Sequence, residues 1–96
     1  MARVVWTPPA LRDLTGPHGF LSPMNPNAAK RAVRAIRRGV RTLAMHPEIG
    51  RPVAEMPPEF REWIIPFGDS GYLTLYRYDS QLVAILAVRH GREAGY

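Results

Sequence analysis

The residues best suited to chemistry lie at the end of the chain, in the run LAVRHGREAGY. Arg89, His90 and Arg92 follow an apolar, strand-like stretch directly, and Tyr96 is the last residue. The imidazole of His90 titrates near neutral pH and can give or take a proton, whereas guanidinium groups bind phosphates. A tyrosine can orient such a histidine or stack on a base. The run indicates either a phosphate-directed site or a solvated strand end.

Two further arginines come from strands predicted earlier in the chain. Arg61 starts the run REWIIPF, and Arg77 lies late in the run YLTLYRY. If these strands are adjacent and antiparallel, the two guanidinium groups could approach each other and bind a phosphate. The strand register, which the sequence does not give, decides whether they meet. We expect guanidinium groups from distant parts of the chain to gather on one concave side.

A third group of cations lies on one predicted helix, where no acidic residue interrupts them. They are Lys30, Arg31, Arg34, Arg37, Arg38 and Arg41. Helices that carry charge only for solubility usually mix the two signs. An anionic partner would relieve the repulsion between like charges, and the net charge of +5 also favours such a partner. The alternative is a solvated outer face without a partner.

The composition of the chain excludes several other kinds of functional site. The chain has no cysteine, which excludes disulfides, thiolate metal sites and cysteine nucleophiles. His18 and His46 lack carboxylates at metal-ligand spacing, so we expect neither a metal nor a cofactor. No apolar run approaches the roughly 20 residues that span a bilayer, and the N-terminus is too short in apolar residues for a secretory signal. We therefore expect a cytoplasmic protein without a membrane partner.

The elements that position these groups follow from local patterns. Residues 3–6 are β-branched and aromatic and predict a strand, and Thr7 before two prolines is a helix start signal. Glycine and proline in segment 15–26 predict a loop or broken helical fragments. Asn25, followed by proline, opens a long helix that Pro47 ends.

The long helix carries an apolar stripe that predicts its buried face. The stripe consists of Ala29, Val33, Ile36, Val40 and Leu43. Gly39 is unfavourable inside a helix by roughly 1 kcal/mol relative to alanine, so we expect it to mark a close packing contact.

The second half of the chain predicts a sheet with strands over 61–67, 72–78 and 82–89. The last strand is apolar on both faces and is therefore expected to be central. The middle strand alternates strictly, and we expect its tyrosines to form the outer face of the sheet. The order β-α-α-β-β-β predicts an α+β fold in which an antiparallel sheet packs against a two-helix hairpin. We expect a single domain over residues 1–96.

Four motifs together resemble the RelE/ParE superfamily of toxins from bacterial type II toxin–antitoxin modules. They are NPNAAKR, HPEIGRP, SGYLTLYR and RHGRE. The resemblance implies a small α+β toxin that forms a hetero-oligomer with a cognate antitoxin, whose extended and often acidic segment would suit the basic surface. It also implies one of two targets. ParE-like members inhibit DNA gyrase and are not nucleases, whereas RelE-like members cleave mRNA on the ribosome.

The resemblance also implies roles for individual residues. In the RelE-like case, the phosphate-binding and proton-transfer groups would be Arg61, Arg77, His90 and Tyr96. The RHGRE ending resembles the ending of ParE-like chains, so we favour a gyrase inhibitor over an endoribonuclease. We expect contacts with the target or the antitoxin from Arg34, Arg38, Arg41, Arg89 and Arg92.

Overall fold

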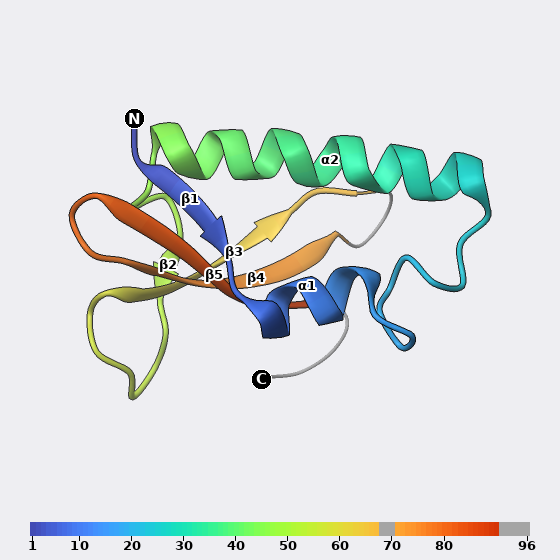
Figure 1. Ribbon diagram of the computed structural model, residues 1–96. Coiled ribbons are helices and arrows are strands. Elements are labelled where there is room, and N and C mark those ends of the chain that lie inside the picture. Colours follow the sequence, from blue (N-terminus) through green and yellow to red (C-terminus); the bar gives the residue numbers. More distant parts are fainter. Residues whose placement is uncertain (68–70, 91–96) are drawn as a thin grey trace.

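The computed structural model describes residues 1–67 and 71–90 and contains two helices and one sheet (Figure 1). The elements in chain order are β1 (Arg3–Trp6), α1 (Pro8–Thr15), α2 (Pro26–Met45), β2 (Arg51–Pro52), β3 (Phe60–Ile65), β4 (Tyr72–Tyr78) and β5 (Leu82–His90). The α+β class is confirmed. The short strand β2 is an addition to the strands that the sequence predicts. None of the described helices is long and apolar enough to cross a bilayer.

All the strands belong to one sheet, in the order β1-β5-β4-β3-β2. The strands from β2 to β5 pair antiparallel, as predicted, but β1 runs parallel to β5 and makes the sheet mixed. A parallel pair requires a long crossover, which the chain between these two strands supplies. Because β5 lies between β1 and β4, both of its edges are paired, which agrees with the predicted central position.

Both helices begin at the residues that the sequence marks. Thr7 Oγ1 accepts a hydrogen bond from the Ala10 amide (3.4 Å), and Asn25 Oδ1 accepts one from the Ala28 amide (2.8 Å). Each cap is followed by proline, whose missing N–H is not needed in the first turn. Turns occupy residues 16–24, so the predicted break between the helices is confirmed. The two helices run in opposite directions and cover one face of the sheet (Figure 1).

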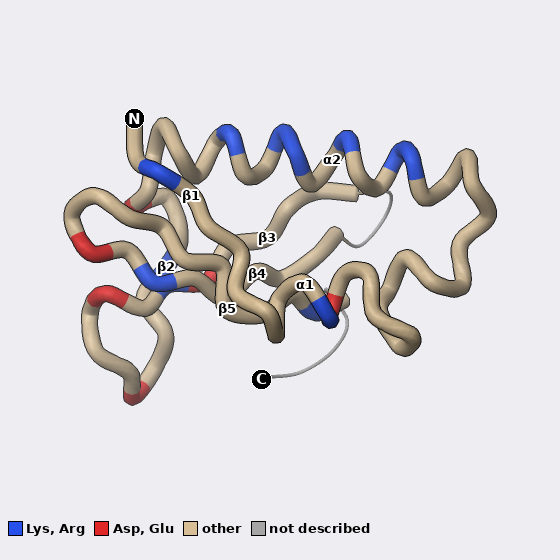
Figure 2. The backbone as a smooth tube through the Cα atoms, viewed as in Figure 1, with Lys and Arg blue, Asp and Glu red and all other residues tan. Residues whose placement is uncertain are grey.

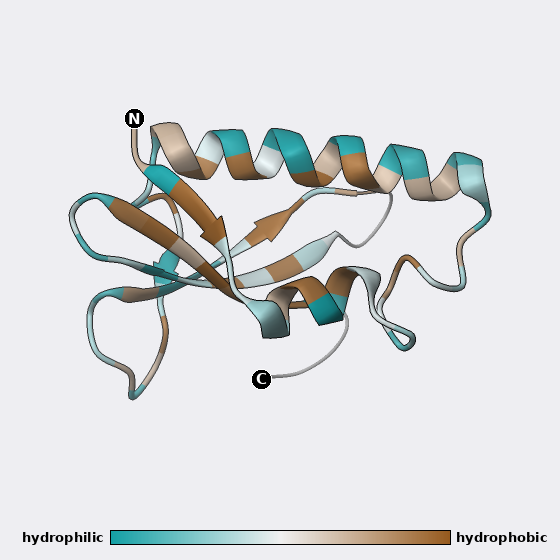
Figure 3. Ribbon diagram, viewed as in Figure 1, coloured by the Kyte–Doolittle hydropathy of each residue, from teal (hydrophilic) through white to brown (hydrophobic). Residues whose placement is uncertain are grey.

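The core lies between these helices and the sheet. Ala10 of α1 and Ile36 and Leu43 of α2 pack in one cluster with Tyr72 and Tyr76 of β4. The side of α2 that faces the sheet is hydrophobic and the opposite side is hydrophilic (Figure 3). The fold is therefore a two-layer arrangement, and no helix of residues 1–67 and 71–90 covers the second face of the sheet.

The tyrosines of β4 do not form the outer face, so that prediction was wrong. Tyr72 is 2% exposed and Tyr76 is fully buried, whereas Leu73 on the opposite face is only half-buried. Burial of Tyr76 is compatible with its hydroxyl because that group is hydrogen-bonded. It accepts from the Gly50 amide (2.9 Å) and donates to the Pro47 carbonyl (2.7 Å). Alternation revealed two faces, but not which face the helices cover.

The buried side of α2 is rotated from the predicted stripe. Ile36 and Leu43 are buried as expected, but Ala29, Val33 and Val40 are only half-buried. The physical reason is that no described element covers the flank of the helix on which the valines lie.

Gly39 is the point of close approach between α2 and the sheet. A Cβ atom at this position would lie 2.7 Å from Cγ1 of Ile65, closer than real carbon atoms approach. Ala32 and Ala35 are also buried on this side. The predicted packing role of Gly39 is therefore confirmed.

Candidate functional site

Arg61 lies on the helix-covered face and fixes the segment that follows α2. Its Nη1 atom donates to the carbonyl oxygens of Gly50 (2.7 Å) and Glu48 (3.2 Å). The Tyr76 hydroxyl binds the same segment through Pro47 and Gly50. Burial raises the pKa of Tyr76 above its ordinary 10.0, although the Gly50 amide and the Arg61 charge partly oppose this rise. The contacts of Arg61 are thus with backbone carbonyls of its own chain.

Arg61 and Arg77 lie on opposite faces of the sheet. In the β3–β4 register, Arg61 is opposite Tyr76 and Arg77 is opposite Phe60. Because cross-strand partners share a face and successive residues alternate, Arg77 projects from the helix-free face. Its Nη1 atom lies 2.9 Å from Oδ2 of Asp79 in the following turn. Antiparallel pairing of these strands therefore does not bring the two guanidinium groups together.

Arg89 attaches the end of β5 to α1. Its Nη1 atom lies 2.8 Å from Oδ2 of Asp13, and the same carboxylate accepts a hydrogen bond from the Val88 amide (3.0 Å). Arg89 is thus ion-paired with a carboxylate of its own chain. The other predicted site residues near this end of the chain, Arg92 and Tyr96, fall outside the described residues.

His90 belongs to an aromatic cluster at the end of the sheet. Its ring meets Tyr72 edge-on at a centroid distance of 6.1 Å. Tyr72 also stacks on Phe20 (4.2 Å) and on Phe67 (5.6 Å), so it contacts several aromatic rings. Burial raises the pKa of Tyr72. On β5 itself, the arginine nearest to this cluster in the chain is Arg89.

The helix-free face of the sheet is largely apolar. Its arginines Arg51, Arg77 and Arg89 are ion-paired, whereas Arg3 makes no ion pair with a described residue. The β3–β4 and β4–β5 registers place on this face Phe60, Glu62, Ile64, Leu73, Leu75, Arg77, Ala84, Ala87 and Arg89. Glu62 adds a negative charge and pairs with Arg51 (2.6 Å). The described guanidinium groups therefore do not gather on one concave side, contrary to our expectation. They are divided among the two sheet faces and the outside of α2.

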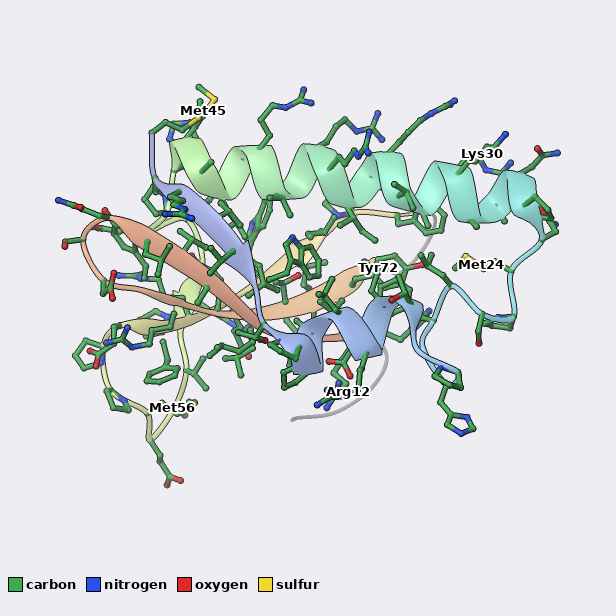
Figure 4. All side chains as sticks on the ribbon, viewed as in Figure 1. Arg12, Met24, Lys30, Met45, Met56 and Tyr72 are labelled. Carbon is green, nitrogen blue, oxygen red and sulfur yellow. The ribbon has the colours of Figure 1, made fainter. Side chains whose placement is uncertain are left out.

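The cations on the outer side of α2 form a continuous surface that we name the α2 ridge. It consists of Lys30, Arg31, Arg34, Arg37, Arg38 and Arg41, all of them exposed. Within residues 1–67 and 71–90, no side chain of the ridge makes an ion pair. Basic positions follow the outer side of α2 along most of its length (Figure 2), and Lys30 points away from the sheet (Figure 4). The ridge is the most concentrated positive charge in the described structure.

A second surface feature is an apolar groove, which the sequence did not reveal. The groove has a volume of about 690 Å³ and lies between β1, α1 and α2. Its lining comprises Met1, Ala2, Val4, Trp6, Leu11, Leu14, Val33, Ile36, Arg37, Val40, Arg41 and Ala44. The only signal for it was the width of the apolar stripe on α2, which exceeds what the sheet covers. We call this feature the β1–α2 groove.

Metal-ligating groups do not cluster in the described part of the chain. No set of three or more histidine, aspartate or glutamate side chains is arranged to hold a metal ion there. Among the described surfaces, the α2 ridge, the β1–α2 groove and the helix-free sheet face are candidates for binding a partner.

Comparisons with known proteins agree with this architecture. The family model of the ParE toxin of the type II toxin–antitoxin system parDE matches residues 4–95. Toxin RelE2 of Caulobacter vibrioides is 33% identical over 90 residues, which cover 94% of this chain and 96% of that protein. The crystal structure of the toxin–antitoxin complex RelBE2 from Mycobacterium tuberculosis has a TM-score of 0.62 at 24% identity, covering 93% of this chain and 96% of that one. At this identity the structural likeness concerns the fold alone.

The match to the family model spans nearly the whole chain, and the relative is similar over almost its full length. Both findings agree with the motifs NPNAAKR, HPEIGRP, SGYLTLYR and RHGRE in the sequence. The chain therefore belongs to the ParE toxin family, within the RelE/ParE superfamily of type II toxin–antitoxin toxins.

Proposed function

We propose that this toxin inhibits growth by binding DNA gyrase without catalysis, and that a cognate antitoxin neutralises it. The observation that carries the proposal is the separation of Arg61 and Arg77 on opposite sheet faces. A nuclease must place several cations around one scissile phosphate. Here Arg61 is bound to backbone carbonyls, and Arg77 and Arg89 are paired with aspartates. The match to the ParE family model also supports this function.

The second candidate is a ribosome-dependent mRNA endoribonuclease. It is favoured by the relative that is named RelE2. In this function Arg61 and Arg77 would bind the phosphate, His90 would act as general acid or base, and Tyr96 would stack or donate a proton. The ribosome and mRNA would then replace gyrase as the partners.

Two assays on the purified toxin distinguish these functions. We expect the toxin to block supercoiling of relaxed plasmid by gyrase and to leave transcripts intact in a translating extract. Cleaved transcripts together with unaffected supercoiling would overturn the gyrase proposal and favour the endoribonuclease. The same preparation of toxin, purified without its antitoxin, is used in both assays. Activity in one assay therefore shows that a negative result in the other is not caused by inactive protein.

We further propose that the β1–α2 groove receives a segment of the antitoxin. The lining is apolar apart from Arg37 and Arg41 at its edge, which suits an amphipathic segment with acidic residues on one side. Leu11 lines the groove and is 45% exposed, so its side chain is available to a partner. Apolar contacts make the complex only modestly sensitive to salt.

The groove proposal is tested by Leu11→Asp, with Ile64→Asp as the matched control. Ile64 is 47% exposed on the helix-free face, so both substitutions place a carboxylate on an exposed aliphatic position. We expect Leu11→Asp to weaken antitoxin binding by about 10-fold or more, as for a central apolar contact, and Ile64→Asp to have little effect. Equal binding by Leu11→Asp and the unsubstituted toxin in calorimetric titration would overturn the groove assignment.

A further inference from the structure

The α2 ridge has three properties that call for a partner. Its cations are exposed, they are not neutralised by described acids, and they succeed one another over about 16 Å of helix, from the rise of about 1.5 Å per residue. By contrast, described ion pairs neutralise Arg51, Arg77 and Arg89 elsewhere on the molecule. The charge on α2 is therefore available to an external anion.

The described acids lie away from the ridge. They are Asp13 on α1, Glu48, Glu55 and Glu59 in the segments after α2, Glu62 on β3 and Asp79 in the β4–β5 turn. Figure 2 shows these positions below α2 or near one end of the molecule, and none on the helix itself. A large polyanion can therefore approach the outer side of α2 without meeting any of the described carboxylates.

The composition of the ridge favours phosphates over an acidic protein. Specific protein interfaces centre on buried aromatic or aliphatic anchors, with charges mainly at the rim. Between Lys30 and Arg41, every exposed residue of α2 is cationic, so the ridge offers no such anchor. Arginine is also the side chain whose planar fork binds phosphate oxygens in pairs.

The same surface favours a duplex over a single strand. Proteins that bind single strands stack the bases on aromatic side chains, and the ridge has none. The major groove of B-DNA is about 12 Å wide and admits the edge of a helix, whereas the major groove of double-stranded RNA is deep and narrow. Duplex DNA carries about one negative charge per 1.7 Å of its axis, which gives more than enough phosphates opposite the ridge.

We propose that the α2 ridge binds the phosphate backbone of duplex DNA, independently of base sequence. This inference goes beyond gyrase inhibition and does not depend on it, because the contact requires only DNA. In this arrangement Arg31, Arg34 and Arg38 neutralise phosphates along the major groove of the DNA, while the opposite side of α2 stays packed on the sheet. A toxin bound in this way would be concentrated on the nucleic acid.

The test is fluorescence anisotropy with a short labelled DNA duplex and no gyrase. About five phosphate contacts give a slope of about −4.5 for the logarithm of affinity against the logarithm of salt concentration. Affinity should therefore fall by a factor of about 10² to 10³ between about 50 and 200 mM salt. Two duplexes of unrelated sequence should bind equally.

A pair of variants with equal net charge makes the assignment specific to the ridge. Arg31→Gln/Arg34→Gln/Arg38→Gln should lower affinity by about 10²-fold at about 50 mM salt and reduce the slope by about 2.7. The control, Arg3→Gln/Arg12→Gln/Arg51→Gln, removes the same charge from exposed positions outside α2 and should change both much less. The charge-preserving variant Arg31→Lys/Arg34→Lys/Arg38→Lys should keep the slope.

Three outcomes would overturn the proposal. In the first, the ridge variant and the control variant bind DNA alike, which would mean that net charge alone decides binding. In the second, polyglutamate competes as strongly as unlabelled DNA, which would indicate an acidic protein as the partner. In the third, an RNA duplex of the same length binds more tightly than the DNA duplex. Since gyrase is absent, none of these results bears on the supercoiling assay.

Discussion

Tyr76 and Arg61 show how single polar groups fix the segment between α2 and β2. The Tyr76 hydroxyl binds Pro47 and Gly50, and the Arg61 guanidinium binds Glu48 and Gly50. Gly50 itself allows this approach, because a Cβ atom there would lie 2.7 Å from the tyrosine oxygen. A family resemblance suggested a phosphate-binding role for Arg61, but its described contacts are with the fold.

A first prediction follows for Tyr76→Phe. The substitution removes both hydrogen bonds and leaves the Gly50 amide and the Pro47 carbonyl without this partner. Loss of a buried hydrogen-bond partner should lower the free energy of unfolding by about 1–3 kcal/mol, measured by urea denaturation. The control is Tyr78→Phe, whose exposed hydroxyl donates to the Ser80 carbonyl at 3.1 Å and should matter little. Equal effects of the two substitutions would contradict this account of Tyr76.

A second prediction concerns alkaline pH. Burial raises the pKa of both Tyr72 and Tyr76 above the ordinary 10.0. A raised pKa in the folded state means that the unfolded chain loses these protons first, so this contribution to stability is full below pH 10 and decreases as the pH rises further. The free energy of unfolding should fall as the pH rises above about 10, and less steeply in Tyr72→Phe. An unchanged slope in that variant would show that Tyr72 is not responsible.

At the scale of elements, the contact between α2 and β3 depends on the absence of a side chain at Gly39. Alanine normally stabilises an exposed helix relative to glycine by about 1 kcal/mol. Here the new Cβ would clash with Ile65, so Gly39→Ala should instead destabilise the protein by about 1–3 kcal/mol. Combining it with Ile65→Val should recover part of the loss in a double-mutant cycle measured by denaturation. A stabilising Gly39→Ala would mean that the two elements can move apart freely.

The attachment of α1 to β5 gives a further prediction at this scale. Strand β1 pairs with β5 only as far as Ile85. Beyond this point the Asp13 carboxylate accepts a hydrogen bond from the Val88 amide. Asp13→Leu should therefore increase hydrogen exchange at the Val88 amide, while Asp13→Asn should retain most of its protection because one oxygen acceptor remains. Exchange rates from NMR measure both. Identical protection in the two variants would show that the hydrogen bond is dispensable.

For the whole molecule, some cations bind groups of the same chain and others are left for a partner. Arg51, Arg77 and Arg89 of the sheet are ion-paired within the chain and Arg61 is bound to backbone carbonyls, whereas the cations of α2 make no ion pair with a described residue. If the toxin acts by binding gyrase, Arg77→Ala and His90→Ala should each retain growth inhibition when expressed without the antitoxin. Folding of each variant is verified by circular dichroism. Loss of inhibition in both folded variants would favour the endoribonuclease, since that function requires these groups.

Much of the secondary structure could be predicted because its signals are local. Thr7 and Asn25 cap the two helices as expected, and the spacing of apolar residues located α2 and the strands β4 and β5. Strand β2 could not be predicted, because two residues carry no periodicity and form a strand only by pairing with β3. The parallel placement of β1 likewise depends on a long-range crossover.

The candidate site was less predictable than the fold. The exposed cations of α2 could be read from the sequence, since helical spacing places them opposite the buried side. The relation between Arg61 and Arg77 could not, because a register shift of one residue moves a side chain to the other face. The β1–α2 groove was also hidden, since it arises from what three separate elements leave uncovered.

By itself, then, the sequence determined the helix boundaries, the basic outer side of α2, and the motifs that identify the family, all of which depend on residues close together in the chain. The tertiary structure alone decided which face of β4 is buried, that Arg61 holds the backbone of its own fold, and where a groove remains open. The physical reason is that strand register and helix placement are set by packing between distant segments, which local residue patterns do not encode.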